Sequence, residues 1–176
     1  MNRFIKPQII AIAFLSLGLC GPARAGGASP AAPENDAIFQ SFVGHWVSNE
    51  PAFGLAAETT MVWAPTLGGK FYRIDYRIEM HAPSGEISVF EGIGFYPAGQ
   101  GKTFRAFWAD NTGDLHPVSA EREGKVLTVI WGRPETELGR TRYELKSPDQ
   151  MKVADWVLTP DGWHQFTQKN LTRSGD

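Results

Sequence analysis

The chain has 176 residues, and 42% of them are hydrophobic, which is enough for one domain with a sizeable core. Its formal net charge of −2 argues against nucleic acid and anionic membrane surfaces as partners. Its one cysteine, Cys20, excludes an internal disulfide and a cysteine-ligated metal site.

Residues 1–25 have the features of a secretory signal peptide. Arg3 and Lys6 precede an apolar stretch of about a dozen residues, which is too short to span a bilayer. Ala23-Arg24-Ala25 supplies the small-x-small pattern of a cleavage site. We therefore expect cleavage near Ala25 and a periplasmic or secreted mature protein. Lipidation at Cys20 is the alternative, because Leu17-Gly18-Leu19-Cys20 resembles a lipobox.

The predicted cleavage makes the mature chain more acidic. Removing the three basic residues of the signal peptide leaves 14 Lys and Arg against 19 Asp and Glu, a formal charge of −5. Residues 26–33 are Gly, Ala, Ser and Pro, which is typical of a flexible leader. Residues 34–173 are predicted to form a single domain, and no further apolar run is long enough to cross a membrane. The sequence does not specify an oligomeric state.

Residues 34–43 are predicted to form a helix before the strands begin. Apolar residues recur at three-to-four spacing, as shown by Ile38, Phe39, Phe42 and Val43. Glu34 and Asp36 stand at the N-terminal end, where the helix dipole favours carboxylates. We expect this helix to plug or flank one end of a sheet, with Gly44 ending it.

From Trp46 to Arg173 the chain is a succession of short β-type runs, each ended by Gly, Pro, Asn or Asp. The predicted strands cover residues 45–48, 58–64, 70–80, 86–95, 102–110, 115–120, 125–131, 139–147, 150–159 and 163–172. Hairpin-length connections join almost all of them, which is typical of antiparallel sheet. Within 70–80, apolar and charged residues alternate, so one face is expected to be buried and the other wet.

An open sheet of this size would leave unpaired edges that invite aggregation. Closure into a barrel removes both edges. We therefore predict an all-β fold, an antiparallel up-and-down barrel of about ten strands with a short N-terminal helix.

Several short motifs resemble the calycin superfamily, which includes the lipocalins. Gly44-His45-Trp46 is similar to the Gly-x-Trp opening of those barrels, in which the tryptophan closes the floor. Three later motifs follow in the order found in an uncharacterised bacterial family of calycin-like barrels: Gly68-Gly69-Lys70-Phe71, Gly94-Phe95-Tyr96-Pro97 and Asp110-Asn111-Thr112-Gly113. The resemblance covers nearly all of residues 37–173. It implies a lipocalin-like fold and a structural role for Trp46, with no agreed activity.

More distantly, the chain resembles the nitrobindin-like haem barrels, which carry a haem-ligating histidine on the final strand. Here Ser48 and Glu50 stand where that family has glycines, and residues 165–168 of the last strand contain no histidine. A haem or metal barrel using His164 or His45 stays an alternative function. We predict no bound cofactor and no metal site, since the four histidines lack the spacing of a metal motif.

Two aspartates beside tryptophans are candidates for buried acids. Asp110 lies two residues after Trp108, and Asp155 directly precedes Trp156. Apolar surroundings raise the pKa of a carboxyl group and fit it for proton transfer. Asp110 is also explained as the first residue of a turn, whereas Asp155 lies in mid-strand. A periplasmic hydrolase or isomerase built on Asp155 and His164 is therefore a further alternative, and whether the protein is an enzyme stays open.

The aromatic residues support the leading functional prediction. Six Trp, four Tyr and eleven Phe are present, and the tryptophans fall on different predicted strands. Around a barrel they could line one apolar pocket. We predict binding of a small apolar or amphipathic ligand, with contacts from Tyr76, Arg105, Trp108, Trp156 and His164. Arg105 is expected to pair with an anionic group at the rim. A solid aromatic core and a protein-interaction module are the alternatives.

Overall fold

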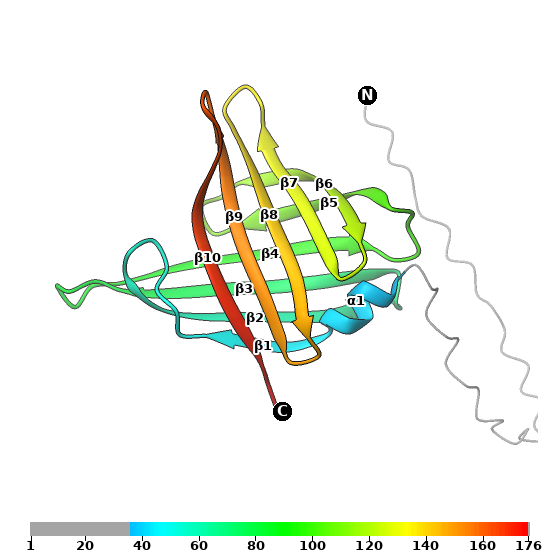
Figure 1. The fold of residues 1–176 in the computed structure, drawn as a ribbon, viewed down its shortest axis with the longest axis horizontal. Coiled ribbons are helices and arrows are strands. Elements are labelled where there is room, and N and C mark those ends of the chain that lie inside the picture. Colours follow the sequence, from blue (N-terminus) through cyan, green and yellow to red (C-terminus); the bar gives the residue numbers. More distant parts are fainter. Residues whose placement is uncertain (1–35, 176) are drawn as a thin grey trace, which may run out of the picture. The chain divides into compact units, whose positions relative to one another are not determined.

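The computed structural model describes residues 36–175, so the predicted signal peptide (1–25) and leader (26–33) lie outside the described residues. The described part is a closed antiparallel barrel of ten strands with one short helix before them, which confirms the predicted fold (Figure 1). Among residues 36–175 no helix is long and apolar enough to cross a membrane.

Each strand pairs with its neighbours in sequence, and the last strand pairs back with the first. The helix is α1 (Ala37–Phe42). The strands are β1 (Gly44–Ser48), β2 (Ala56–Thr66), β3 (Phe71–His81), β4 (Ile87–Pro97), β5 (Thr103–Asp110), β6 (Leu115–Glu123), β7 (Val126–Arg133), β8 (Glu137–Ser147), β9 (Gln150–Thr159) and β10 (Gly162–Ser174).

The alternation predicted for the long third strand is present in β3. Its apolar residues face the interior, where Tyr72, Ile74 and Ile78 are buried. The charged residues between them face outward, where Arg77 forms ion pairs with Glu79 at 2.8 Å and with Glu91 at 3.0 Å. Such exposed pairs add little stability, so the buried apolar face determines the register of this strand.

The helix α1, Ala37–Phe42, lies within the predicted segment 34–43, of which residues 34 and 35 lie outside the described residues. Asp36 does not act as the cap that its position suggests. Its side chain makes no capping hydrogen bond to α1. Instead its carboxylate accepts hydrogen bonds from the Gly99 backbone N–H at 2.8 and 3.1 Å, and the guanidinium of Arg122 lies 3.5 Å away. The carboxylate therefore fastens the start of α1 to the β4–β5 loop and to β6. After Phe42 the backbone becomes extended at Val43, with φ −50° and ψ 130°.

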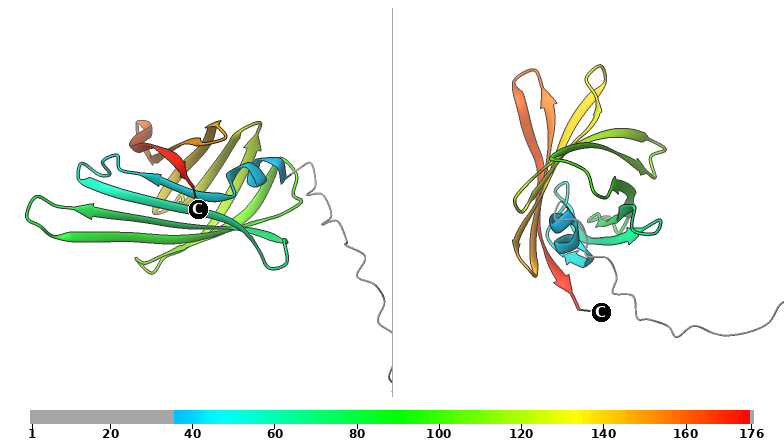
Figure 2. Two further views of the ribbon diagram at one scale, coloured as in Figure 1. Left: turned by 90° about the horizontal axis from the view of Figure 1, so that it is seen from below. Right: turned by 90° about the vertical axis from the view of Figure 1, so that its right-hand side faces the viewer.

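The helix lies at one end of the barrel (Figure 2). Its apolar side chains pack there in a cluster of aromatic rings. We call this cluster the aromatic plug: Phe39, Phe42, Trp46, Trp63, Tyr72, Tyr96, Phe104 and Tyr143. Phe39 stacks on Tyr72 with the ring centroids 4.9 Å apart. The Trp46 indole N–H donates to the carbonyl oxygen of Phe42 at 2.7 Å. Trp46 therefore joins the helix to β1 at the floor, where the calycin resemblance places it.

The seam between the first and last strands is short. β1 and β10 are paired at three residues of each strand, with Trp46 opposite Arg173. The Arg173 guanidinium donates to the carbonyl oxygens of Val43, Ser41 and Pro148 and lies 4.1 Å from the centroid of the Trp46 indole. One side chain thus links the helix, the seam and the β8–β9 turn.

Candidate functional site

A cavity of about 380 Å³ occupies the end of the barrel opposite α1, which we call the open end. The volume is within the usual range of small-molecule sites. Aromatic and aliphatic side chains make most of its wall: Tyr76, Ile78, Met80, Phe90, Trp108, Val118, Val129, Trp131 and Val153. Tyr96 and Tyr143 of the aromatic plug form its floor.

Two glycines let tryptophan rings lie flat against the barrel wall. A methyl group added at Gly92 of β4 would lie 2.0 Å from the Trp108 ring on β5. A methyl group added at Gly139 of β8 would likewise lie 2.0 Å from the Trp131 ring on β7. Any larger residue at these positions would push the indole toward the centre of the barrel. These two glycines therefore help to keep the cavity open.

Both indole N–H groups that line the cavity are linked to carboxylates by hydrogen bonds, one directly and one through a threonine hydroxyl. Trp108 Nε1 donates to Asp110 Oδ2 at 3.1 Å. Trp131 Nε1 donates to Thr141 Oγ1 at 3.0 Å, and the Thr141 hydroxyl donates to Asp155 Oδ1 at 2.6 Å. The second chain crosses the neighbouring strands β7, β8 and β9 and fixes the orientation of the Asp155 carboxyl group.

The pKa of the Asp155 carboxyl group is raised by its surroundings in the cavity wall. Burial raises its pKa from 3.8 to about 6, while the hydrogen bond from Thr141 and the positive charge of Lys169 act in the opposite direction. Asp155 is partly buried, and its carboxyl group lines the cavity. A carboxyl group that titrates near neutral pH fits either charge recognition or proton transfer.

Lys169 is fully buried beside the cavity, next to the lining residue Tyr76, which is unusual for a lysine. Its Nζ lies 3.2 Å from Thr59 Oγ1 and 5.8 Å from the centroid of the Tyr76 ring. Burial lowers the pKa of Lys169, and the negative charges of Asp155 and Glu50 raise it part of the way back.

The tyrosines near Asp155 stay protonated at neutral pH. Burial raises the pKa of Tyr76 well above 10, and the negative charge of Asp155 raises it further. Burial does the same to the pKa of Tyr143, with added contributions from Tyr96 and Asp155. Their hydroxyl groups therefore remain possible hydrogen-bond donors.

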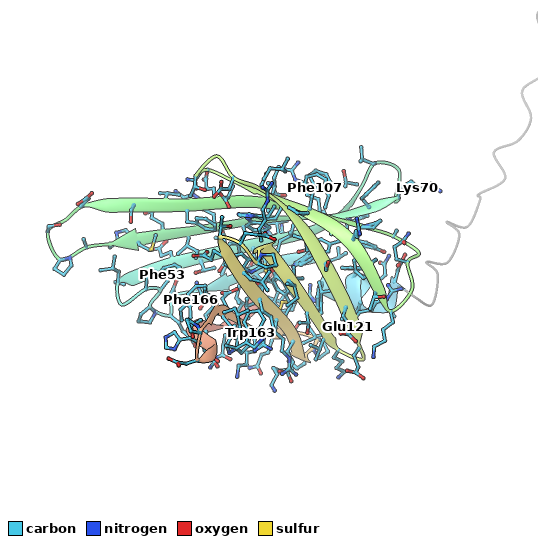
Figure 3. All side chains as sticks on the ribbon, turned by 90° about the horizontal axis from the view of Figure 1, so that it is seen from above. Phe53, Lys70, Phe107, Glu121, Trp163 and Phe166 are labelled. Carbon is cyan, nitrogen blue, oxygen red and sulfur yellow. The ribbon has the colours of Figure 1, made fainter. Side chains whose placement is uncertain are left out.

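Two phenylalanines lie at the mouth of the cavity, at the end of the barrel away from α1 (Figure 3). Phe53, from the β1–β2 loop, stacks on Phe166 of β10 with ring centroids 6.0 Å apart and an interplanar angle of 19°. Phe166 lies where the pairing of β10 with β9 shifts between Gln165 and Thr167. This bulge turns Phe166 toward the mouth, and 55% of Phe53 remains exposed.

Two of the five predicted ligand contacts, Tyr76 and Trp108, line the cavity, and their rings pack together at 6.3 Å. The other three do not line it. Arg105 lies in a shallow depression on the outer face of the barrel. Trp156 also faces outward, and its ring packs on the Arg140 guanidinium at 4.4 Å. His164 is exposed near the start of β10.

The alternation of side chains along a strand explains why Arg105 and Trp156 face outward. Neighbouring residues on a strand face opposite sides, so an inward Asp155 puts Trp156 outside. Arg105 is an odd number of residues from the inward Trp108, which puts it outside by the same rule. The hydrolase or isomerase alternative built on Asp155 and His164 stays a prediction: β10 places Thr167 opposite Asp155 and His164 opposite Val157. A ligand contact at Arg105, Trp156 or His164 stays a prediction, outside the cavity.

Three cavity or near-cavity residues were missed by sequence reasoning. Thr141 has no motif that distinguishes it from other strand threonines, and Lys169 would ordinarily be assigned to the surface. Trp131 was counted among the tryptophans but not among the contacts, although Gly139 opposite it was a usable signal. Residues 36–175 contain no group of three or more His, Cys, Asp or Glu side chains arranged to hold a metal ion.

No family model matches the chain, and no curated protein matches it significantly. Among solved structures, the fold resembles the S-type phycobiliprotein lyase CPES from Guillardia theta, with a TM-score of 0.56 and 9% sequence identity. The match covers 80% of this chain and 93% of that chain. At this identity the likeness shows the fold alone. It supports a calycin-like barrel, while the resemblance to the bacterial family and to nitrobindin-like barrels stays a prediction.

Proposed function

We propose that this protein binds a small, largely apolar molecule non-covalently in the cavity at the open end. The observation that carries the proposal is the cavity of about 380 Å³ with aromatic and aliphatic walls inside a closed barrel. Burial of apolar ligand surface there would contribute roughly 25 cal/mol per Å² to the binding free energy, before the costs of association. A phycobiliprotein lyase shares the fold, which is consistent with a ligand-binding role.

The proposal includes export of the protein before it acts. The basic start, the short apolar stretch and Ala23-Arg24-Ala25 support cleavage near Ala25 and a periplasmic or secreted location. Expression of the full chain in a bacterial host, followed by mass determination of the fractionated protein, tests this part. We expect a mature chain beginning at Gly26 outside the cytoplasm. A chain of unprocessed mass in the cytoplasm would contradict export.

A neutral fluorescent probe tests the binding site itself. N-phenyl-1-naphthylamine becomes fluorescent in apolar surroundings, so we expect a saturable signal with one site per chain. Val129 is buried and lines the cavity, so Val129→Phe should fill the space and weaken binding by about tenfold or more. Val47 lies on the outer face of β1 and is 39% exposed, so Val47→Phe is the matched control. Equal binding by the two variants would place the probe elsewhere and refute the proposed site.

A further inference from the structure

The charged side chains around the cavity are acidic. Four carboxyl-bearing residues and His116 line it, and neither lysine nor arginine is found among the described lining residues. Asp155 lies in the wall, and the other three lie at the ends of strands or in the loop at the mouth: Asp110, Asp114 and Glu137. Walls of low polarity strengthen the field of such groups, which favours a positively charged ligand.

The Asp155 carboxyl group has one oxygen without a protein donor. Thr141 donates to Oδ1, and Oδ2 accepts no hydrogen bond from the described residues. Lys169 lies close enough for its charge to act on Asp155, but its Nζ donates to Thr59 and makes no described hydrogen bond to Asp155. Asp155 lines the cavity and is only partly buried, so a ligand N–H that reaches this oxygen gains a strong, charge-assisted hydrogen bond.

The described hydrogen-bond donors that line the cavity are uncharged apart from His116, and the two indole N–H groups among them are not free for an anion. Both lining indole N–H groups are already used, by Asp110 for Trp108 and by Thr141 for Trp131. An anionic ligand would meet carboxylates without a lysine or arginine in the lining to offset them. The anionic group that the sequence suggested for a contact with Arg105 therefore has no counterpart inside the cavity.

The aromatic walls complete the pattern. Tyr76 packs edge-on against both Trp108 and Phe90, at 6.3 and 6.5 Å, and Trp131 packs against His116 at 6.1 Å. The electron-rich faces of Trp and Tyr attract cations, and this attraction increases when the cation is desolvated. The same rings bury the apolar body of a ligand.

We propose that the ligand is an organic cation, a protonated amine or quaternary ammonium joined to an apolar body that fits a cavity of about 380 Å³. This inference rests on the proposed function and names the ligand class for the same site. The apolar body lies against the aromatic and aliphatic wall, and the cationic group lies near the free oxygen of Asp155 or the carboxylates of the mouth.

Three probes of nearly equal shape separate charge from fit. They are 2-(1-naphthyl)ethylamine, 2-(1-naphthyl)ethanol and 1-naphthaleneacetate, titrated into the mature chain by calorimetry at neutral pH. The amine is protonated under these conditions, the alcohol is neutral and the acetate is an anion. We expect the amine to bind about tenfold or more tightly than the alcohol, and the acetate to bind weakest. The amine preference should decrease as salt is added.

Variants then locate the charge that is recognised. Asp155→Asn should remove most of the amine preference while keeping the affinity for the alcohol within about twofold. Glu123→Gln removes one exposed carboxylate at the end closed by α1, and should leave the preference unchanged. If Asp155→Asn does not fold by circular dichroism, Glu137→Gln at the exposed mouth replaces it, with a smaller loss of preference expected.

The outcomes distinguish the two proposals. Equal binding of the three probes, or preference for the acetate, would overturn the organic cation and leave the apolar binding site standing. Binding of none of the three probes, together with no binding of N-phenyl-1-naphthylamine, would remove the site itself. An amine preference that survives in both acidic-residue variants would also overturn the assignment to these carboxylates.

Discussion

The two ends of this barrel hold similar side chains and pack them in opposite ways. At the end closed by α1, large rings meet one another, and Phe39 and Trp63 are almost completely buried. At the open end, the equally large rings of Trp108 and Trp131 lie back against Gly92 and Gly139. The cavity therefore depends on small residues in the strands beside the large ones, rather than on a shortage of large residues.

The largest effect expected from this contrast is on stability. Phe39 packs against Tyr72, Tyr96 and Phe104 and is 0% exposed, so Phe39→Ala should lower the free energy of unfolding by about 3 to 5 kcal/mol. The same change at Phe90, which already faces the cavity, should cost less than half as much. Urea unfolding of the two variants measures the difference. Equal losses of unfolding free energy in the two variants would contradict the difference in packing between the end closed by α1 and the open end.

The second prediction concerns the pH dependence of stability that Asp155, in the cavity wall at the open end, should produce. The folded-state pKa of Asp155, about 6, exceeds its usual 3.8, so the folded chain binds the proton more tightly. The stability that this proton provides is fully present below pH 3.8 and is lost as the pH rises through 6, in total about 3 kcal/mol. Lys169, Tyr76 and Tyr143 face the same group, and both tyrosines stay neutral throughout this range.

Asp155→Asn should flatten the stability profile between pH 4 and pH 7, as measured by urea unfolding at each pH. Asp149 is an exposed carboxylate near the other end of β9, and Asp149→Asn serves as the matched control. A profile for Asp155→Asn that keeps the wild-type slope would show that Asp155 is not the group responsible.

The third prediction concerns a substitution that should partly fill the cavity at the open end. Gly92→Ala places a methyl group 2.0 Å from the Trp108 ring, so the indole must move into the cavity. We expect a loss of about 1 to 3 kcal/mol in unfolding free energy and weaker binding of N-phenyl-1-naphthylamine. Gly101→Ala is the control, because a methyl group there meets open space. Unchanged probe affinity in Gly92→Ala would separate these glycines from the shape of the cavity.

The smallest expected effect is at the mouth. Phe53 is 55% exposed and stacks on Phe166, so Phe53→Ala should change the unfolding free energy by less than about 1 kcal/mol. Its effect should appear in kinetics, as faster dissociation of the bound probe in a stopped-flow experiment. Phe107→Ala, at another exposed and stacked ring on the outer face, is the control. Identical dissociation rates for the two variants would exclude Phe53 from control of the mouth.

The fold was predictable because its signals are local. Period-two alternation in β3 and turn residues such as Pro83 and Gly85 indicate strand and hairpin without knowledge of their partners. The role of Asp36 could not be predicted, because its hydrogen bond with Gly99 joins distant parts of the chain. A carboxylate at that position gives the same local signal whether it caps a helix or binds a loop.

The site was only partly predictable, because it depends on which strands become neighbours. If Trp108 and Asp155 point inward, the alternation of side chains along a strand predicts that Arg105 and Trp156 point outward, away from the cavity. This alternation fails across a bulge, and the shift between Gln165 and Thr167 could not be read from the sequence. The contact of Trp131 with Thr141 requires the pairing of β7 with β8 as well as side-chain orientation.

The short seam between β1 and β10, which Arg173 links to α1, determines where unfolding of the barrel should begin. β1 and β10 are paired at three residues, whereas β2 and β3 are paired along eleven. Sub-global opening should therefore start as detachment of β1 from β10, with release of α1 and the rings it carries. Amide protons at this junction should exchange with deuterium well before those of β2 and β3. Under mild denaturant such detachment would uncover Tyr96 and Tyr143, on which Phe39 and Phe42 of α1 pack, and so expose the cavity at its floor rather than at its mouth.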